Sequence, residues 1–173
     1  MSAAKNYLLE IHYNSSNASA QDASGVEVCV TAEPPKNKTI LSWLGTDAIS
    51  STSATATCDP ASNERIHIIA GTPHMHLKGT HMKVVINRKN GMKEIAHDEP
   101  FGFENQRVYP EDIWIEPGDT ITITCTYNAP ATFGPGTNQE MCYWFAMHYP
   151  PLALADGAPL GNVIHGPNTC LGL

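Results

Sequence analysis

Threonine alternates with apolar residues throughout Thr120-Ile121-Thr122-Ile123-Thr124-Cys125-Thr126-Tyr127. Successive side chains of a β-strand point to opposite faces, so this period of two predicts a strand with one face buried and the other in water. Pro117-Gly118-Asp119 lies directly before the run and predicts a tight turn after a strand over residues 112–116. Half-buried strands joined by tight turns are typical of antiparallel sheets.

The rest of the chain adds β-type segments and no sustained helical period. Residues 141–149 are a dense apolar run ended by Pro150-Pro151, which predicts a central strand buried on both faces. Further strands are predicted over residues 7–13, 26–31, 66–70 and 82–87, with Asn90-Gly91 as a hairpin turn and 128–139 as a loop. With 173 residues the chain can bury a core of its own. The sequence therefore predicts one all-β domain over residues 1–173, an antiparallel β-sandwich.

The composition favours a small molecule as the partner. The net charge is −7 and Lys and Arg form no runs, which argues against nucleic acid and against an anionic membrane surface. No apolar stretch approaches the ~20 residues of a membrane span, and residues 1–6 lack the apolar core of a signal peptide. Because Tyr7 already begins an apolar alternation, we expect the chain to begin inside a longer protein.

The five cysteines are widely spaced and include no C-x-x-C pair of the kind that binds zinc or acts as a redox dithiol. Two disulfides and one leftover thiol is the natural interpretation. It predicts an oxidising compartment, so that the protein is secreted or periplasmic. The alternative is five buried, reduced cysteines in a cytosolic domain.

Two histidines, His74 and His76, stand two residues apart. If this stretch is extended, both imidazoles lie on one face of a strand, about 7 Å apart at Cα. They can then lean toward one metal ion while Met75 points away. The alternative is a pair of partly exposed strand histidines without a ligand. Hydrolytic and phosphoryl-transfer chemistry is disfavoured, because no Ser/His/Asp or Gly-rich phosphate motif stands out.

The best candidate for a third ligand is Met141, at the start of the apolar run. Two imidazoles and a soft thioether favour Cu(I) over zinc, calcium or magnesium. Methionine is also a common gap filler in apolar strands, so a core role for Met141 is the alternative. If Cys125 and Cys142 form a disulfide, strand alternation turns Met141 to the face opposite that bridge, at the mouth of the loop.

The remaining histidines and the acidic pairs have structural interpretations. His67 lies seven residues before His74, which on a continuous strand places it on the opposite face. Asp98-Glu99 and Glu111-Asp112, next to prolines, are interpreted as solvated loop charges. The other histidines have no spacing partner and are expected to be hydrogen-bonded or exposed: His81, His97, His148 and His165.

Several motifs, taken in chain order, resemble a known family. They are His74-Met75-His76-Leu77-Lys78-Gly79, Glu116-Pro117-Gly118-Asp119, Thr124-Cys125-Thr126-Tyr127-Asn128, Glu140-Met141-Cys142 and His148-Tyr149-Pro150. In this combination they resemble the C-terminal catalytic domain of the copper type II, ascorbate-dependent monooxygenases, the family of dopamine β-monooxygenase and peptidylglycine α-hydroxylating monooxygenase. The similarity runs from Tyr7 to Cys170.

The resemblance implies a jelly-roll-like β-sandwich that holds copper on His74, His76 and Met141. In that family this copper activates O2 and the substrate C–H bond is hydroxylated. The electrons come from ascorbate or another donor. The resemblance therefore raises Met141 from a core residue to a ligand.

The resemblance also implies the disulfides Cys125–Cys142 and Cys58–Cys170. A bridge across a loop as short as that between Cys125 and Cys142 stabilises a protein by roughly 3 kcal/mol in the chain-entropy model. Cys29 is then left over and is interpreted as a buried free thiol, with an intermolecular link as the alternative.

Two features depart from the family pattern. Residues 1–31 resemble the last part of a preceding domain that binds a second copper, and His12 matches its third ligand, but the adjacent His pair expected further upstream is absent. Where the peptide-processing enzyme carries a substrate-binding Arg, an Asn and a Tyr, this chain has Thr72, Tyr143 and Phe145. A peptidylglycine substrate is therefore disfavoured, and a more apolar or aromatic substrate fits better.

The first hypothesis is the catalytic half of a larger copper- and ascorbate-dependent monooxygenase. Its partners are a small-molecule substrate, O2 and an upstream copper domain of the parent protein. The second hypothesis is a non-enzymatic copper-binding carrier or sensor on the same fold, favoured by the missing second copper site. The third is a structural β-sandwich that binds no metal.

Overall fold

The computed structural model describes residues 19, 21–29, 32–60, 64–151 and the backbone of 169–171. The chain divides into two compact units, Met1–Lys36 and Asn37–Leu173. In the first unit the described residues form no strand, so the strand predicted over 26–31 is wrong for 26–29. An alternating pattern makes a strand only where a partner strand takes up its backbone hydrogen bonds. The strand predicted over 7–13 lies outside the described residues.

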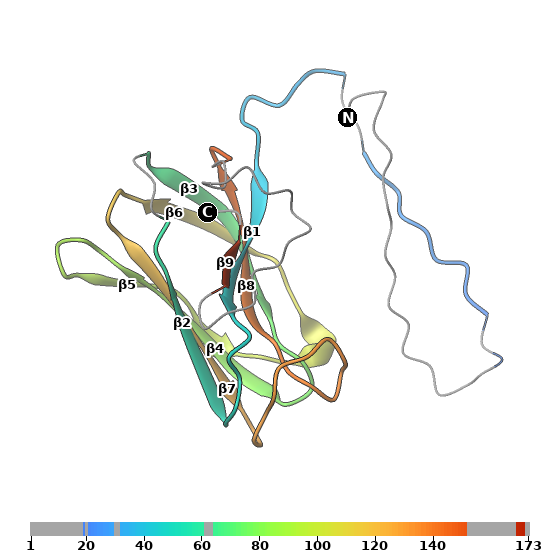
Figure 1. The fold of residues 1–173 in the computed structure, drawn as a ribbon. Coiled ribbons are helices and arrows are strands. Elements are labelled where there is room, and N and C mark those ends of the chain that lie inside the picture. The colour runs from blue at the N-terminus through green and yellow to red at the C-terminus, as the bar shows by residue number, and fades with distance from the viewer. Residues whose placement is uncertain (1–18, 20, 30–31, 61–63, 152–168, 172–173) are drawn as a thin grey trace. The chain divides into compact units, whose positions relative to one another are not determined.

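The second unit is built from two antiparallel sheets that pack as a sandwich (Figure 1). One sheet has the strand order β6-β3-β8-β1-β9 and the other has the order β2-β7-β4-β5. The described strands are β1 Ile40–Thr46, β2 Ser53–Cys58, β3 Ile66–His74, β4 Gly79–Asn87, β5 Lys93–Pro100, β6 Tyr109–Ile115, β7 Thr120–Tyr127, β8 Cys142–Tyr149 and β9 Thr169–Leu171. A short 3₁₀ turn, η1, spans Phe103–Asn105. The predicted all-β, jelly-roll-like sandwich is confirmed.

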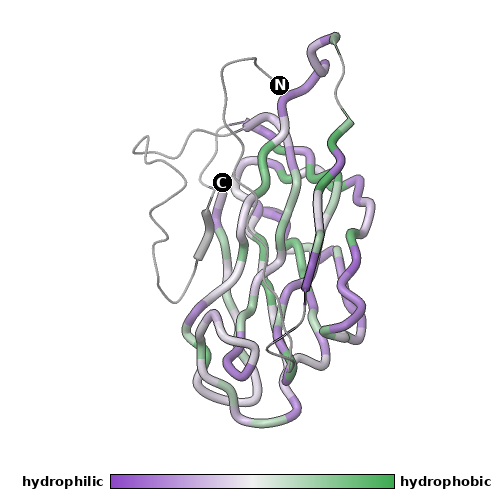
Figure 2. Tube along the Cα trace, turned by 90° about the vertical axis from the view of Figure 1, so that its right-hand side faces the viewer, coloured by the Kyte–Doolittle hydropathy of each residue, from purple (hydrophilic) through white to green (hydrophobic). Residues whose placement is uncertain are grey.

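The apolar core lies between the sheets and follows from alternation along the strands. β7 has the predicted bounds, and its inward residues Ile121 and Ile123 are fully buried. Figure 2 shows that hydrophobic and hydrophilic residues alternate along the chain of the sandwich. Both predicted turns are confirmed by hydrogen bonds from the Gly91 N–H to the Arg88 carbonyl and from the Asp119 N–H to the Glu116 carbonyl. Gly91 and Gly118 adopt φ values of +87° and +92°, which favour glycine. Among the described residues, no helix has the length and apolar character needed to cross a bilayer.

β8 is the central strand of its sheet, with β3 on one side and β1 on the other. On its inner face Trp144 and Ala146 are fully buried. On its outer face Tyr143 is buried, Phe145 is half-buried and Met147 is exposed. The prediction of a central strand is confirmed, whereas the predicted burial on both faces holds at Tyr143 and is wrong at Phe145 and Met147.

β5 lies at the edge of the four-stranded sheet and has no alternation in its sequence. Most of its side chains are exposed, so charged residues can occupy both faces, as is common on edge strands. Asp98 belongs to this strand and pairs with Lys83 of β4 at 2.7 Å. The interpretation of Asp98-Glu99 as loop charges is therefore wrong.

β3 contains a register shift between Ile68 and Ala70, typical of a β-bulge. The extra residue changes the parity of the strand, so His67 and His74 both occupy half-buried, outward positions. The prediction that they lie on opposite faces is therefore wrong. The structural role expected for His67 is confirmed, because its imidazole stacks on Trp114 and hydrogen-bonds Asp112 at 2.6 Å.

A disulfide joins Cys125 of β7 to Cys142 of β8, as predicted, and so links the two sheets. Cys58 is also disulfide-bonded. The side chain of its expected partner, Cys170, lies outside the described residues, so this pairing stays a prediction. Cys29 is free, as predicted, but it is exposed. Its predicted burial is wrong because the described residues around it form no sheet that could cover it.

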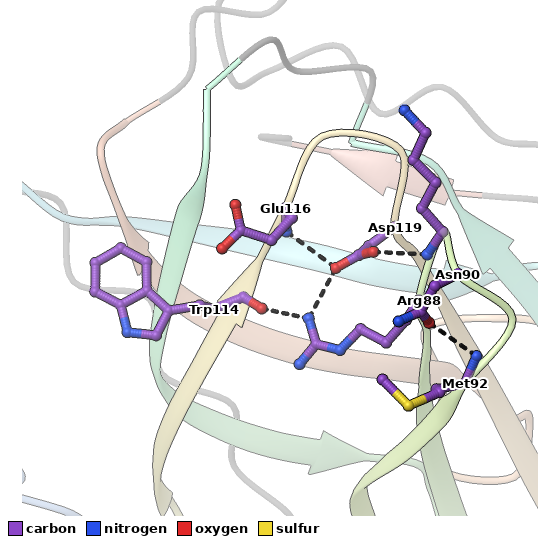
Figure 3. A pocket seen from close by; sticks show the side chains of 7 residues that line it. Arg88, Asn90, Met92, Trp114, Glu116 and Asp119 are labelled. Atoms are coloured by element: carbon purple, nitrogen blue, oxygen red, sulfur yellow. Dashed lines mark hydrogen bonds and ion pairs between the residues drawn. The ribbon is translucent and has the colours of Figure 1, made fainter.

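An ion pair joins two turns at the end of β4 that is remote from the His-x-His stretch (Figure 3). The Arg88 guanidinium donates to the Trp114 carbonyl and to the Asp119 carboxylate, which lies 2.8 Å away. The same carboxylate accepts hydrogen bonds from the backbone N–H groups of Lys89 and Glu116. These residues border a cavity of about 400 Å³. Since the charges satisfy one another, we interpret this end of the sandwich as structural.

Candidate metal centre

The two histidines lie where β3 ends and its turn into β4 begins. His74 is the last residue of β3, and His76 opens a turn that is closed by a hydrogen bond from the Gly79 N–H to the His76 carbonyl at 3.1 Å. The ring centroids of the two histidines are 5.3 Å apart. Met75 between them is fully buried in the core. The structure therefore brings the two rings together and turns Met75 away, as expected.

Each imidazole has its Nδ1 beside oxygens that can only accept hydrogen bonds. His74 Nδ1 donates to Gln106 Oε1 at 2.9 Å. His76 Nδ1 donates to the backbone carbonyls of Gly136 and Gln139, at 3.1 Å and 3.0 Å. In a neutral imidazole the other nitrogen then carries the lone pair. Both rings are thus set as the tautomer that can bind a metal through Nε2.

The surroundings of His74 favour its neutral form. Burial lowers the pKa of His74 below its ordinary value of 6.5, and the neighbouring His76 lowers it further. The hydrogen bond to Gln106 and the charge of Glu140 act in the opposite direction without reversing the shift. A lowered pKa keeps the imidazole neutral near pH 7, and the neutral form is the one that ligates metals.

Met141 lies directly before β8 and is half-buried. The register of β3 and β8 pairs His74 with Tyr143. This pair is the last of the ladder; His76 lies two residues beyond His74 and Met141 two residues before Tyr143, so both flank the same end of the paired stretch. The Met141 carbonyl accepts a hydrogen bond from the Tyr127 hydroxyl at 3.1 Å. The backbone of Met141 is therefore anchored to β7 at the same end of the sandwich as the two histidines.

Glu140 connects the histidine turn to the Met141 segment. Its fully buried carboxylate accepts hydrogen bonds from the backbone N–H groups of His76 at 2.8 Å and of Lys78 at 2.6 Å. Burial raises the pKa of the Tyr127 phenol, and the charge of the nearby Glu140 raises it further. A buried carboxylate in this structure thus bonds directly to the backbone of a predicted ligand.

Aromatic side chains surround the histidine pair. Phe145 stacks on His74 with ring centroids 5.1 Å apart, and Phe103 of η1 meets His76 edge-on at 6.1 Å. Trp43 of β1 packs against Phe145 at 4.8 Å and continues the aromatic surface along the outer face of the sheet. This surface, Phe103, Phe145 and Trp43, is referred to below as the aromatic wall.

The other described histidines have partners elsewhere. His148 is buried and bonds Ser42 at 2.7 Å, His97 packs on Tyr109, and His81 lies 3.2 Å from Asp98. His12 and His165 lie outside the described residues. Within the described parts of the chain, no three His, Cys, Asp or Glu side chains gather closely enough to hold a metal. The predicted ligand set contains only two such residues, His74 and His76, because its third member is the thioether of Met141.

Sequence patterns did not single out two residues of this site. Gln106 orients His74 from an irregular segment that carries no motif. Glu140 belongs to the Glu-Met-Cys motif, but the motif alone says nothing about which groups the carboxylate binds. Both act across large separations in the chain, 32 residues for Gln106 and 64 for Glu140, so only the fold reveals their partners.

Comparison with known proteins shows which proteins this chain is similar to. The chain is similar to dopamine beta-hydroxylase of Canis lupus familiaris, with 29% identity over 84% of this chain and 24% of that protein. It is similar to dopamine beta-hydroxylase of Homo sapiens, with 32% identity over 80% of this chain and 23% of that protein. DBH-like monooxygenase protein 1 of Mus musculus is 31% identical over 57% of this chain and 18% of that protein. The chain spans about a quarter or less of the length of these relatives.

The family comparison covers most of the sandwich. Residues 24–157 match the family described as copper type II ascorbate-dependent monooxygenase, C-terminal domain. The matched range contains His74, His76 and Met141, together with the disulfide Cys125–Cys142. Because the match extends over more than half of the chain, this chain belongs to the copper type II ascorbate-dependent monooxygenase family and corresponds to its C-terminal domain.

Proposed function

We propose that this chain is the copper-binding catalytic domain of a reductant-dependent monooxygenase, with His74, His76 and Met141 as the metal ligands. Family membership supports the monooxygenase class in general. Met141 is assigned from the family resemblance, whereas the observation that carries the assignment of the two histidines is the state of their imidazoles. Their rings are adjacent, and each has its Nδ1 engaged by an acceptor, which leaves Nε2 of both rings as the lone-pair nitrogen.

The donor set fits Cu(I). Imidazole and thioether are borderline and soft ligands, which copper accepts and which magnesium and calcium do not favour. Metal-binding histidines almost always donate their second ring N–H to a carbonyl, a carboxylate or water, as both rings do here. When bound, copper supplies the activation of O2 for hydroxylation of a substrate C–H bond.

The residues beside the histidines favour an apolar or aromatic small molecule as the substrate. The aromatic wall offers stacking and apolar contact next to His74. Thr72 stands opposite Phe145 in the register of β3 and β8, where it offers a hydroxyl and no positive charge. A substrate recognised through a carboxylate would need a cation at such a position.

The disulfides support an oxidising compartment, so we place the protein outside the cytosol, either secreted or periplasmic. Ascorbate or another small reductant is the expected electron donor. We also expect an upstream copper domain of the parent protein as a partner, because residues 1–31 resemble its last part and His12 matches one of its ligands.

The test is an anaerobic Cu(I) titration of the wild-type protein beside Met141→Leu. Leucine has nearly the volume of methionine, so the fold should remain while the thioether is lost. We expect one tight equivalent in the wild type and an affinity at least ~10-fold lower in the variant, since even outer-shell changes cost that much. Hydroxylation activity should be abolished.

Met147→Leu is the matched control, because Met147 is an exposed methionine of β8, six residues after Met141. It should bind copper as the wild type does. Unchanged affinity in Met141→Leu would remove Met141 from the site. Tight binding without oxidation of any aromatic or apolar substrate would favour a copper carrier or sensor, and no binding by the wild type would contradict the copper site altogether.

A further inference from the structure

We infer that Glu140 is a positioning residue of the metal centre: its carboxylate holds the backbone of the His76 turn against the segment that carries Met141. The inference rests on the proposed function and deepens it. It assigns to Glu140 no contact with the metal and no part in the reaction. Its role is to keep ligands from two distant parts of the chain in one arrangement.

Two hydrogen bonds join the carboxylate to the backbone of one turn. Its two oxygens accept from the N–H groups of His76 and Lys78, which flank Leu77. Leu77 is 51% exposed, so the tip of this turn is not held by the packing of its own side chain. The buried carboxylate therefore adds a backbone anchor to this turn, beside the hydrogen bonds from Asn128 N–H to the Lys78 carbonyl and from Lys78 Nζ to the Pro130 carbonyl.

The backbone of Glu140 is fixed in turn by its own loop. Its N–H donates to the Thr132 carbonyl at 2.9 Å, and its carbonyl accepts from the Gly134 N–H at 3.1 Å. The next residue is Met141, and the one after it forms the disulfide to β7. A displacement of the histidine turn relative to Met141 would therefore have to break the bonds of the Glu140 carboxylate.

The chemistry of the contact requires a carboxylate. Two backbone donors point at two oxygens, and an ionised carboxylate offers acceptors on both. The amide of glutamine has the same shape, but one of its ends is a donor and would face one of the N–H groups. Glu140→Gln thus removes half of the anchor without creating a cavity.

The structure provides a matched control in Asp119. Asp119 is also a buried carboxylate that accepts two backbone N–H groups, those of Lys89 and Glu116. It lies at the other end of β4, away from the histidine turn. Asp119→Asn should therefore perturb the fold in a similar way without touching the metal centre.

The experiment measures the Cu(I) dissociation constant by anaerobic competition with a chromophoric chelator, for wild type, Glu140→Gln and Asp119→Asn, alongside the melting temperature. Outer-shell partners of metal ligands typically change affinity by about 10–100-fold, and we expect a loss of that size in Glu140→Gln. Asp119→Asn should melt at a lower temperature and keep the wild-type affinity.

The outcomes separate the inference from the proposed function. Wild-type affinity in Glu140→Gln would overturn the role of Glu140 alone. Equal losses in both variants would overturn it as well, because the effect would then follow from general destabilisation. If the wild type bound no Cu(I), the proposed function and this role would fall together.

Amide hydrogen exchange of the wild type tests the same point should Glu140→Gln fail to fold. Copper that binds only the anchored state suppresses the local opening that breaks the anchor. The amides of His76 and Lys78 should therefore exchange more slowly with Cu(I) than without it, and by a larger factor than those of Lys89 and Glu116. Equal effects on all four amides, or none on any, would overturn the inference.

Discussion

Glu111 shows how one side chain can depend on the fold. Its sequence context suggests a solvated loop charge, but it lies within β6 and is half-buried. Burial raises its pKa to about 7, from an ordinary value of 4.5. The folded state therefore holds the proton more tightly than the unfolded state does, and the stability that this contributes is present below the unfolded pKa and lost as the pH rises through 7.

Glu111→Gln should therefore stabilise the protein relative to wild type at pH 8 and much less at pH 4, because glutamine carries no charge to desolvate. Melting temperatures of both proteins at the two pH values measure this. Glu104→Gln, at an exposed position in η1, is the control and should show no such pH-dependent difference. A Glu111→Gln protein less stable than wild type at pH 8 would contradict the buried-carboxyl explanation.

At the scale of elements, the histidine turn follows β3 and Met141 precedes β8, and these two strands are neighbours in one sheet. Antiparallel register pairs His74 with Tyr143, two residues after Met141, the disulfide ties β8 to β7, and the Glu140 carboxylate accepts a hydrogen bond from the His76 N–H. Each connection joins elements far apart in the chain. The proposed site therefore depends on the packing of the strands, and no single segment contains all of its residues.

The double variant Cys125→Ala, Cys142→Ala tests this coupling between elements. Loss of the bridge should lower the free energy of unfolding by roughly 3 kcal/mol, mainly because the unfolded chain gains freedom. It should also weaken Cu(I) binding, since the Met141 backbone loses one of its anchors. Guanidinium unfolding and Cu(I) titration measure the two effects.

Cys29→Ala serves as the control for the disulfide variant, because Cys29 is exposed and unbridged. It should alter neither stability nor copper affinity. A bridge-free protein that folds and binds Cu(I) as tightly as the wild type would show that the disulfide supports the fold and leaves the site unaffected.

At the scale of the whole sandwich, the two ends of β4 lie next to different groups of residues. One end carries the histidine turn, and the other carries the pairing of Arg88 with Asp119. Burial by itself would raise the pKa of Asp119, but the hydrogen bonds from Arg88 and from two backbone N–H groups outweigh it and lower the pKa below its ordinary 3.8. The stability that this contributes is present above the unfolded pKa and is lost as the pH falls through the lower folded pKa.

Asp119→Asn should cost about 1–3 kcal/mol at pH 7, the usual cost of leaving buried donors poorly paired. Its disadvantage should shrink as the pH falls below 3.8, because the wild-type carboxylate is then being protonated as well. Urea unfolding at pH 7 and at pH 3 measures both values. A difference in unfolding free energy between the variant and the wild type that stays constant across this range would contradict an ionised Asp119 carboxylate in the wild type.

The sandwich and part of its strands could be predicted from the sequence because alternation is local, whereas β1, β5 and β9 were not predicted. The alternation of threonine and isoleucine in β7 predicts which face of the strand is buried, and the apolar run of β8 predicts its central position in the sheet. The His-x-His pair is equally local, since residues 74 and 76 need only an extended backbone to bring their rings together. The cysteine pair followed from the family resemblance and is confirmed.

Other features depend on contacts that the order of residues does not display. The bulge in β3 moved His67 to the face of His74, and edge position allowed β5 to form without alternation. Burial raised the pKa of Glu111 to about 7. Folding also brought the Glu140 carboxylate to the backbone of His76, 64 residues earlier in the chain. Such contacts form only when the sheets pack, because their partners are neighbours in space and distant along the chain.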